Sequence, residues 1–390
     1  MKIAVVCDSF KGSLTSKDAC AAVKDGLLRC NKNFEVLSLP FADGGEGTSR
    51  CFYDILGGQL RKASVHDPLL REITAEYTVL PDGTDVIDVA SASGLTLLKS
   101  SERDAVKVSS LGSGELICNA AEHGAKHIIL GLGGSATTDA GTGILYALGM
   151  RFFSEDGAEV LPDGQNMIRV KKIRRTENFE RFKDIKFTLA CDVTNPLCGE
   201  NGAAYVFAPQ KGASKNDVEL LDDGLRNIGE IFEKASGKKI IDLPGAGAAG
   251  GIGGGLSAFL NCELQSGFDV LARAASLEDK IRRSDAVITG EGKTDRQTLF
   301  GKLPKRVSDI ARKFGVPCIL LSGDVENDIS AEKLGVCEIH KIKENGISLE
   351  HCMKNAASLL SERAFTIGKD SKIINKQYSR KQEKMRENER

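Results

Sequence analysis

The sequence of 390 residues predicts an α/β protein with two domains, one of them built on a parallel sheet. Three observations lead to this prediction. The chain begins with strand, loop, helix and strand patterns, which is how a parallel sheet starts. A hairpin pattern interrupts this rhythm in the middle, and the last third returns to alternating strands and helices. A chain of this length is also long for one hydrophobic core, so two domains are expected.

The N-terminal part is predicted as strand, helix and strand. Lys2–Cys7 is an apolar run of the buried-strand type. Thr15 and Asp18 have the spacing of a helix-capping pair, and apolar residues recur on one face of the helix that follows. Phe34–Leu39 is the second strand, and the loop 42–48 leads into another helix.

The middle of the chain has a different pattern. Apolar residues alternate over 73–79, and after a Pro-Asp-Gly turn a second run at 86–89 completes an antiparallel hairpin. A strand is expected at 187–191, followed by a long helix capped by Ser214. A further strand is expected at 239–243, directly before a glycine-rich segment.

The last third is predicted to contain strands at 286–289, 318–322 and 338–342. We expect them to join the N-terminal strands in one parallel, flavodoxin-like sheet, with the hairpin-bearing middle as a second domain of mixed α/β type. The predicted parts are residues 1–65 with 275–365, the inserted domain 66–274, and a basic tail at 366–390. The tail shows no apolar periodicity, so we expect it to be disordered or a frayed helix without a function of its own.

Charge and cysteine content exclude several classes of function. The net charge is −1, and the tail from Lys369 carries eight Lys or Arg against four Asp or Glu, so the rest of the chain is slightly acidic. Such a body lacks the basic footprint of a nucleic-acid-binding protein, and no apolar run approaches the roughly 20 residues of a membrane helix. The eleven cysteines show no CxxC spacing, which favours reduced thiols in a cytoplasmic enzyme over disulfides or zinc.

The segment 127–149 has the layout of an anion site. An apolar strand leads into a glycine turn and a helix start, an arrangement that points backbone N–H groups at an anion. The residues predicted to contact the anion are Gly133, Gly134, Ser135 and Thr137. Asp139 belongs to the same loop, although a carboxylate repels a phosphate unless a metal or a proton lies between them. The alternative is a strand–helix turn that these polar side chains merely cap.

Five loops at predicted strand ends combine glycine with carboxylates and with hydroxyls or lysine. They are DSFKGS, ADGGEGT, GGSATTDAG, CDVTNP and GEGKTD. Ligands of open α/β sheets bind outside the C-terminal strand ends, where these loops would meet. Their chemistry suits phosphoryl transfer, because Mg²⁺ needs oxygen ligands, phosphates need N–H groups and lysine, and the acceptor hydroxyl needs a base.

Two other functions compete with this one. The segment Gly245–Gly250 matches GxGxxG and Asp269 follows at the distance of a ribose-binding acid, which would suit a dinucleotide-dependent oxidoreductase. The same glycines would equally allow close helix packing. A non-catalytic sugar-acid sensor would share the two-domain plan, but binding one organic acid does not call for so many carboxylates.

Seven motifs, in this order, resemble those of the bacterial glycerate kinases of the first type. They are DSFKGSLTS, FADGGEGT, ASASGL, GLGGSATTDAGTGILYALG, CDVTNPLCGENGAAYVFAPQKGAS, LPGAGAAGG and TGEGKTDRQTLFGK. The resemblance covers residues 1 to about 365. It implies ATP- and Mg²⁺-dependent phosphorylation of D-glycerate, usually at the 2-hydroxyl. It also implies two α/β domains, one flavodoxin-like and one likened to a restriction endonuclease, and it leaves homodimer formation open. The chain departs from the family pattern at Asp88, Thr138, Ala140 and Lys293.

The resemblance and the loop chemistry together suggest roles for individual residues. Lys11 would neutralise the transferring phosphate or hold the glycerate carboxylate, unless it is only a solvated loop lysine. Asp192 would act as general base or Mg²⁺ ligand, unless it caps the turn 194–196. Asp295 is a further candidate for catalysis, and Glu291 is a further candidate for Mg²⁺. The other predicted substrate- or nucleotide-binding residues are Ser9, Asp43, Glu46, Asn195, Gly290 and Lys302. The sequence does not show which of these acids is the general base and which is a metal ligand.

Overall fold

The structure of the chain, a computed structural model, describes residues 1–160, 162–344 and 346–388 and divides into two compact units. Unit 1 comprises Met1–Asp43 and Leu271–Arg390, and unit 2 comprises Gly44–Val270. The sequence analysis placed residues 44–65 with the first domain, whereas the structure places them in unit 2. The reason is an unpredicted strand within this stretch, which pairs with the unit 2 sheet.

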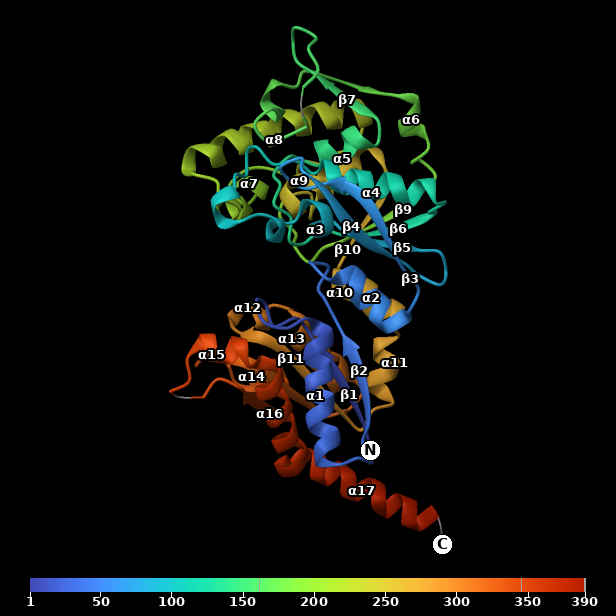
Figure 1. The fold of residues 1–390 in the computed structure, drawn as a ribbon, viewed down its shortest axis with the longest axis vertical. Helices are drawn as coiled ribbons and strands as arrows, with labels where there is room; N and C mark the ends of the chain where they lie inside the picture. The colour runs from blue at the N-terminus through green and yellow to red at the C-terminus, as the bar shows by residue number, and fades with distance from the viewer. Residues whose placement is uncertain (161, 345, 389–390) are drawn as a thin grey trace. The chain divides into compact units, whose positions relative to one another are not determined.

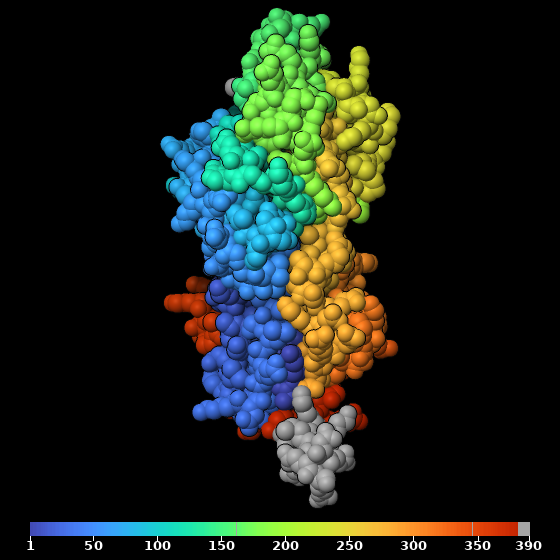
Figure 2. All heavy atoms as spheres, turned by 90° about the vertical axis from the view of Figure 1, so that its right-hand side faces the viewer, coloured from blue at the N-terminus to red at the C-terminus, as the bar shows by residue number. Residues whose placement is uncertain are grey.

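Unit 1 contains a five-stranded sheet in which every neighbouring pair is parallel. In spatial order its strands are β2 (Glu35–Pro40), β1 (Lys2–Cys7), β11 (Ala286–Thr294), β12 (Cys318–Val325) and β13 (Glu338–Lys341). Cys7 of β1 lies in register with Gly290 of β11, so both ends of the chain share one sheet (Figure 1). Figure 2 shows the blue N-terminal segment beside the orange segment of this unit. The predicted parallel sheet is confirmed, and its strand order is flavodoxin-like.

Helices cover this sheet. The side chain of Thr15 accepts a hydrogen bond from the backbone N–H of Asp18 at the start of α1 (Ser16–Cys30), as its spacing predicted. A Cβ on Gly26 of α1 would lie 2.0 Å from the carbonyl oxygen of Ser361 in α16 (Ala356–Asp370), so this close crossing requires glycine. Helix α13 (Leu303–Lys313) packs against β1, β11 and β12. The other helices here are α11 (Leu277–Arg282), α12 (Arg296–Leu299), α14 (Ala331–Leu334) and α15 (Leu349–Lys354), while α10 (Gly267–Ala274) spans the boundary.

Strand β11 is longer than the sequence analysis predicted. The expected strand ended at Thr289 and was followed by a loop. In the structure the strand continues to Thr294, since Lys293 lies in register with Asp324 of β12. Side chains alternate along a strand, so Glu291 and Lys293 point to the same side.

The basic tail is helical, so of the two predicted alternatives, disorder and a frayed helix, the structure shows a helix. Helix α17 spans Lys372–Asn388. Ile374 is completely buried in the core of unit 1, and the ring of Tyr378 lies 5.8 Å from that of Phe34. Ile374 and Tyr378 are four residues apart and therefore share a helix face. Ile374, together with the partly buried Ile373 and Tyr378, packs this otherwise polar segment against the core of unit 1.

Unit 2 is built on a six-stranded mixed sheet. In spatial order its strands are β10 (Asn261–Gln265), β9 (Lys186–Ala190), β6 (His127–Gly131), β5 (Asp85–Asp88), β4 (Glu72–Val79) and β3 (Gln59–His66). The first four run parallel, whereas β4 pairs antiparallel with both β5 and β3. The predicted hairpin is therefore confirmed as β4 and β5. Strand β3 is the unpredicted strand that draws residues 44–65 into this unit.

The helices of unit 2 include the long α8 (Lys215–Ser236), which Ser214 caps reciprocally with Asp217 as predicted. The remaining elements are α2 (Thr48–Leu56), α3 (Ala90–Ser93), α4 (Leu111–Glu122), α5 (Thr142–Ala147), α6 (Glu177–Glu180), α7 (Ala203–Phe207), α9 (Ala248–Phe259), the hairpin β7 (Met150–Phe153) with β8 (Lys172–Arg175), and the 3-10 turns η1 (Leu95–Leu97), η2 (Ser100–Glu102), η3 (Met167–Arg169) and η4 (Pro209–Lys211). None of the described helices in either unit is long and apolar enough to cross a membrane.

The strand expected at 239–243 is absent from this described part of the chain. The backbone N–H groups of Ile240 and Ile241 instead donate to the carboxylate of Glu233, at 2.8 and 3.1 Å. The glycines after this segment serve packing: a Cβ on Gly250 would lie 2.0 Å from the carbonyl oxygen of Thr137. The dinucleotide interpretation of these glycines therefore loses the strand that it requires.

Candidate active site

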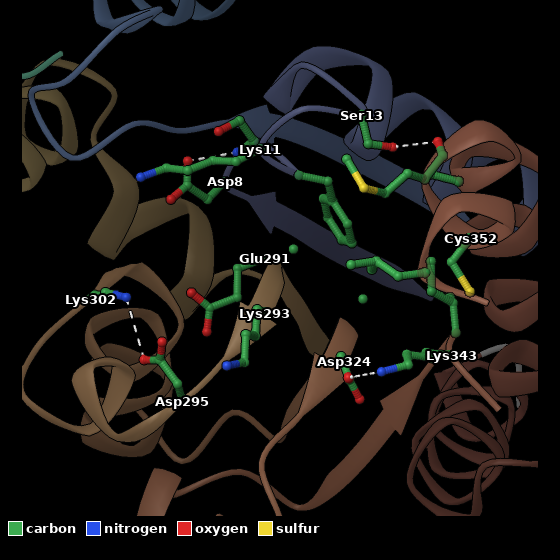
Figure 3. A pocket seen from close by; sticks show the side chains of 18 of the residues that line it. Asp8, Lys11, Ser13, Glu291, Lys293, Asp295, Lys302, Asp324, Lys343 and Cys352 are labelled. Atoms are coloured by element: carbon green, nitrogen blue, oxygen red, sulfur yellow. Dashed lines mark hydrogen bonds and ion pairs between the residues drawn. The ribbon is translucent and has the colours of Figure 1, made fainter. Parts of the chain in front are cut away.

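A pocket of unit 1 lies at the C-terminal ends of β1, β11 and β12 and has a volume of about 560 Å³. The chain runs outward in opposite directions from β1 and β11, so this is the topological switch point of the sheet. Open α/β sheets bind their ligands at such points. Figure 3 shows Asp8 and Lys11 from the loop after β1 opposite Glu291 and Lys293 of β11.

The acidic groups of this pocket influence one another. The pKa of Asp8 is raised to about 7, mainly by burial and further by the negative charges of Asp43 and Glu291. Burial also raises the pKa of Glu291, whose carboxylate accepts a hydrogen bond of 2.7 Å from the hydroxyl of Thr298. A carboxyl group with a pKa near neutrality can exchange a proton during a reaction. Asp8 is thus the most distinctive ionisable group of this edge, and the sequence analysis had not singled it out.

Cations and hydrogen bonds hold the remaining side chains. Asp295 caps α12 and its carboxylate lies 3.4 Å from the ammonium of Lys302. Lys343 pairs with Asp324 at 2.7 Å, at the end of the pocket where Cys352 of α15 also lies (Figure 3). Lys11 reaches the pocket from the β1 loop and stabilises the ionised form of Asp8 by its charge.

Glycines allow close backbone packing beside the pocket. A Cβ on Gly323 would lie 2.1 Å from the carbonyl oxygen of Gly292, and one on Gly290 would lie 2.3 Å from that of Leu321. A Cβ on Gly292 would lie 3.2 Å from the Cα of Phe10. The β11–β12 ladder and the loop after β1 therefore approach each other more closely than larger residues would allow.

The C-terminal edge of the unit 2 sheet carries a second group of predicted residues. Asp88, Gly131 and Ala190 lie in register at the ends of β5, β6 and β9, which places the turn of Gly133 and the loop of Asp192 at the same edge. The carboxylate of Asp88 accepts hydrogen bonds of 3.0 Å from the backbone N–H groups of residues 47 and 49, and burial raises its pKa to about 7. Asp192 itself is exposed.

The loop 44–47 crosses this edge. A Cβ on Gly133 would lie 2.5 Å from the Cα of Gly45, and one on Gly134 would lie 3.5 Å from the Cβ of Glu46. Glu46 accepts a hydrogen bond of 3.2 Å from the hydroxyl of Thr96. The two glycine loops are thus packed backbone to backbone, as the glycine-rich sequences require.

Lys211 is buried under the loop that the sequence predicted to bind an anion. It is 4% exposed, and its ammonium donates to the hydroxyl of Ser135 at 3.1 Å and to the carbonyl of Thr137 at 2.6 Å. No carboxylate lies within ion-pair distance of it among the described residues. Burial lowers its pKa to about 8. The hydroxyls of Thr137, Thr138 and Thr142 in the same loop are buried without a hydrogen-bond partner.

Two of the predicted binding residues form hydrogen bonds with neighbouring residues of unit 2. Asp139 is fully buried, and its carboxylate accepts hydrogen bonds from the hydroxyl and the N–H of Ser110 at 2.7 and 2.9 Å and from the N–H groups of Gly141 and Gly143. These hydrogen bonds organise the loop, and a contact of Asp139 with a ligand stays a prediction. Asn195 donates to the carbonyl of Asn201 at 2.8 Å and holds its own turn.

The predicted site residues thus fall into two groups, each at the C-terminal edge of one sheet. Unit 1 brings together Ser9, Lys11, Asp43, Gly290, Glu291, Asp295 and Lys302. Unit 2 brings together Glu46, Gly133, Gly134, Ser135, Thr137, Asp139, Asp192 and Asn195. The residues that the sequence analysis missed are Asp8, Asp324, Lys343 and Lys211. Asp8 and Lys211 both lie in motifs that had been singled out, so the signal was present.

In unit 1, a metal ion would need phosphate oxygens as ligands in addition to the protein carboxylates. The described residues contain no cluster of three or more His, Cys, Asp or Glu that could hold a metal by itself. Mg²⁺ is commonly held by one or two carboxylates together with substrate phosphates, and Asp8 and Glu291 offer such carboxylates at the pocket. The two predicted metal ligands, Asp192 and Glu291, belong to different units.

Comparison with known proteins agrees with the site chemistry. The model of the glycerate kinase family matches residues 3–372. A glycerate 2-kinase of Escherichia coli is 41% identical over 84% of this chain and 87% of the relative, and a glycerate kinase of Halalkalibacterium halodurans is 38% identical over 94% and 97%. A crystal structure from Salmonella typhimurium LT2, of a protein assigned as glycerate kinase 2, superposes with a TM-score of 0.82 at 35% identity and covers 94% of this chain and 97% of that one. The chain therefore belongs to the glycerate kinase family, whose enzymes transfer a phosphoryl group to an alcohol.

Proposed function

We propose that this glycerate kinase uses ATP and Mg²⁺ to phosphorylate D-glycerate at the 2-hydroxyl, giving 2-phospho-D-glycerate in organic acid metabolism. The observation that carries the proposal is the switch-point pocket of unit 1, where carboxylates and lysines meet at the C-terminal edge of a parallel sheet. The choice of the 2-hydroxyl rests on the printed name of the relative from Escherichia coli. A kinase that transfers to an organic acid needs this combination of acids, cations and backbone donors.

The residues of unit 1 would act as follows. Lys11 and Lys302 would balance the negative charge of the transferred phosphoryl group, for which Lys11 reaches into the pocket from the loop after β1. Asp8 and Glu291 would hold Mg²⁺, which supplies neutralisation of phosphate charge and orientation of its oxygens. Asp295 would keep Lys302 oriented through their contact of 3.4 Å.

Asp192 would act as the general base that accepts the proton of the acceptor hydroxyl, or it would be a ligand of the metal ion. It follows β9 directly and lies at the sheet edge that also carries Gly133 and Gly134. A hydroxyl group is a poor nucleophile at neutral pH, so a carboxylate that accepts its proton accelerates the reaction. The competing role is a cap for the turn 194–196, and substitution separates the two.

The decisive experiment is a coupled assay of ADP release. It would use the full chain with D-glycerate, with L-glycerate and without an acceptor, each with Mg²⁺ and with EDTA. Phosphorus NMR of the product would then identify the phosphorylated hydroxyl. We expect ADP release that requires both D-glycerate and Mg²⁺. Absence of glycerate-dependent ADP release would refute the proposal, and 3-phosphoglycerate as product would refute its regiochemistry.

Three further expectations belong to this proposal. A cytoplasmic location is consistent with eleven cysteines that are all free thiols in the structure. Homodimer formation stays a prediction, which sedimentation would test. Oxidation of a substrate with a dinucleotide is not expected, because the glycines at Gly245–Gly250 are used for packing.

A further inference from the structure

The unit 1 pocket has only charged and polar side chains at one end, whereas apolar residues lie beside the Lys343–Asp324 ion pair at the other. Asp295 and Lys302 lie at one end, whereas Cys352 and Lys343 lie at the other (Figure 3). The apolar surface comes from Phe10, Ile342 and the α15 residues Leu349, Cys352 and Met353. This division of the lining indicates a ligand that is itself apolar at one end and anionic at the other.

The apolar wall is open to solvent. Leu349 is 60% exposed and Met353 is 38% exposed, which makes them two of the few large apolar side chains left exposed among the described residues. Exposed apolar groups gathered in a concave site usually contact a ligand. A three-carbon hydroxy acid such as glycerate has almost no apolar surface to cover this wall, and it would fill only a small part of about 560 Å³. A purine base is flat and largely apolar, so it would cover this wall and fill more of the pocket.

The wall is held in place from the β1 loop. The hydroxyl of Ser13 donates to the carbonyl oxygen of Met353 at 2.8 Å. Gly12 has a φ of +75°, and a Cβ there would lie 3.0 Å from the terminal methyl group of Met353. The loop that carries Asp8 and Lys11 is therefore fixed directly to α15, so the acids, the lysine and the apolar wall form one site.

We propose that this pocket binds the adenine nucleotide, with its base against Leu349 and Met353 and its phosphates directed toward Lys11 and Lys302. The inference rests on the proposed function and goes beyond it by naming the subsite and its residues. Because Asp8 and Glu291 are also present, the pocket favours a nucleotide whose phosphates carry a divalent cation over a free one.

Leu349→Glu tests this subsite. The side chain is 60% exposed, so a glutamate is compatible with folding, but its charge would lie against the base. Binding of a fluorescent N-methylanthraniloyl-ATP with Mg²⁺ to the full chain is measured without glycerate, followed by the KM values for ATP and for glycerate. We expect the Kd and the KM for nucleotide to rise by about tenfold or more, and the KM for glycerate to change less than about twofold.

Leu220→Glu is the matched control, because Leu220 is 38% exposed on α8 in unit 2 and lies outside the pocket. It should bind nucleotide like the wild type, and both variants should melt within about 2 °C of it. Unchanged nucleotide binding by folded Leu349→Glu would overturn the subsite while leaving the kinase activity intact. A selective rise in the KM for glycerate would assign the pocket to the acid and also overturn it. Failure of the wild type to bind any nucleotide would overturn the proposed function together with the subsite.

Discussion

Replacing Asp8 with asparagine should stabilise the protein at neutral pH and impair catalysis. The amide keeps an oxygen that can accept the 2.6 Å hydrogen bond from the backbone N–H of Ser9. It removes a carboxylate that burial, Asp43 and Glu291 disfavour in the folded state. The change therefore separates the electrostatic cost of Asp8 from its local shape.

The magnitude follows from the pKa of Asp8. A folded-state pKa of about 7, against roughly 4 in the unfolded chain, corresponds to at most about 4 kcal/mol. The side chain is partly exposed, so we expect roughly 1–3 kcal/mol after solvent screening. Since the folded state binds the proton more tightly, wild-type stability falls as pH rises from about 4 to about 7. The stability gain of Asp8→Asn should be absent near pH 4, grow between pH 4 and 7, and level off above that.

Thermal melts at pH 4.5, 6 and 8 measure this gain. A unit of this size shifts by about 2–4 °C per kcal/mol, so the gain should be visible at pH 8. Glycerate-dependent ADP release by the same variant should fall about 10²-fold or more, if Asp8 acts on a proton or a metal. Asp370→Asn, on the exposed end of α16, is the control and should show no pH-dependent gain. A gain of equal size at pH 4.5 and pH 8, or no gain at either, would refute the reasoning.

Two other substitutions and one truncation have defined expected outcomes. Asp192→Asn should lower kcat about 10²-fold or more with an almost unchanged Tm, whereas a turn cap predicts lower stability and near-normal turnover. Lys211→Met removes a buried ammonium that has no acid partner, so the Tm should stay level or rise while kcat/KM for glycerate falls at least about tenfold. Lys215→Met, at an exposed position on α8, is the control. A large loss of Tm in Lys211→Met would show that Lys211 is structural. Deletion of residues 371–390 removes the buried Ile374 and should cost roughly 2–3 kcal/mol in urea unfolding, whereas deletion of 381–390 should cost much less; equal costs would contradict the packing of α17.

Local patterns predicted most of the elements because they depend on neighbouring residues. The capping pairs at Thr15 and Ser214 start helices as expected, and alternation over 73–79 produces β4. The failures occurred where a distant partner decides the outcome. Residues 239–243 have strand composition, but Glu233 takes up two of their backbone N–H groups. Strand β3 forms because β4 offers it an edge.

The candidate site likewise has features that depend on neighbouring residues and features that depend on residues distant in the sequence. The sequence predicted loops where glycine, acid and lysine accumulate, but residues 290–294 of the GEGKTD segment lie in β11 and not in a loop. The motif DSFKGS contained Asp8, but its raised pKa was not visible in the sequence, because it depends on burial and on Asp43 and Glu291, which the fold brings to it. The burial of Lys211 depends likewise on its contact with Ser135 from a distant loop. Sequence patterns therefore indicated the composition of the site, whereas the charge state of individual groups needed the tertiary structure.

Both sheet edges carry buried carboxyl groups whose pKa values burial raises, namely Asp8 and Glu291 in unit 1 and Asp88 in unit 2. Unit 2 differs because it also buries the ammonium of Lys211, whose pKa burial lowers and which donates to Ser135 and Thr137. A buried charge is relieved by a ligand of opposite sign, which is a divalent cation for a carboxylate and an anion for an ammonium. Leu349→Glu and Lys211→Met therefore probe separate groups: the first should act on the KM for nucleotide, and the second on kcat/KM for glycerate.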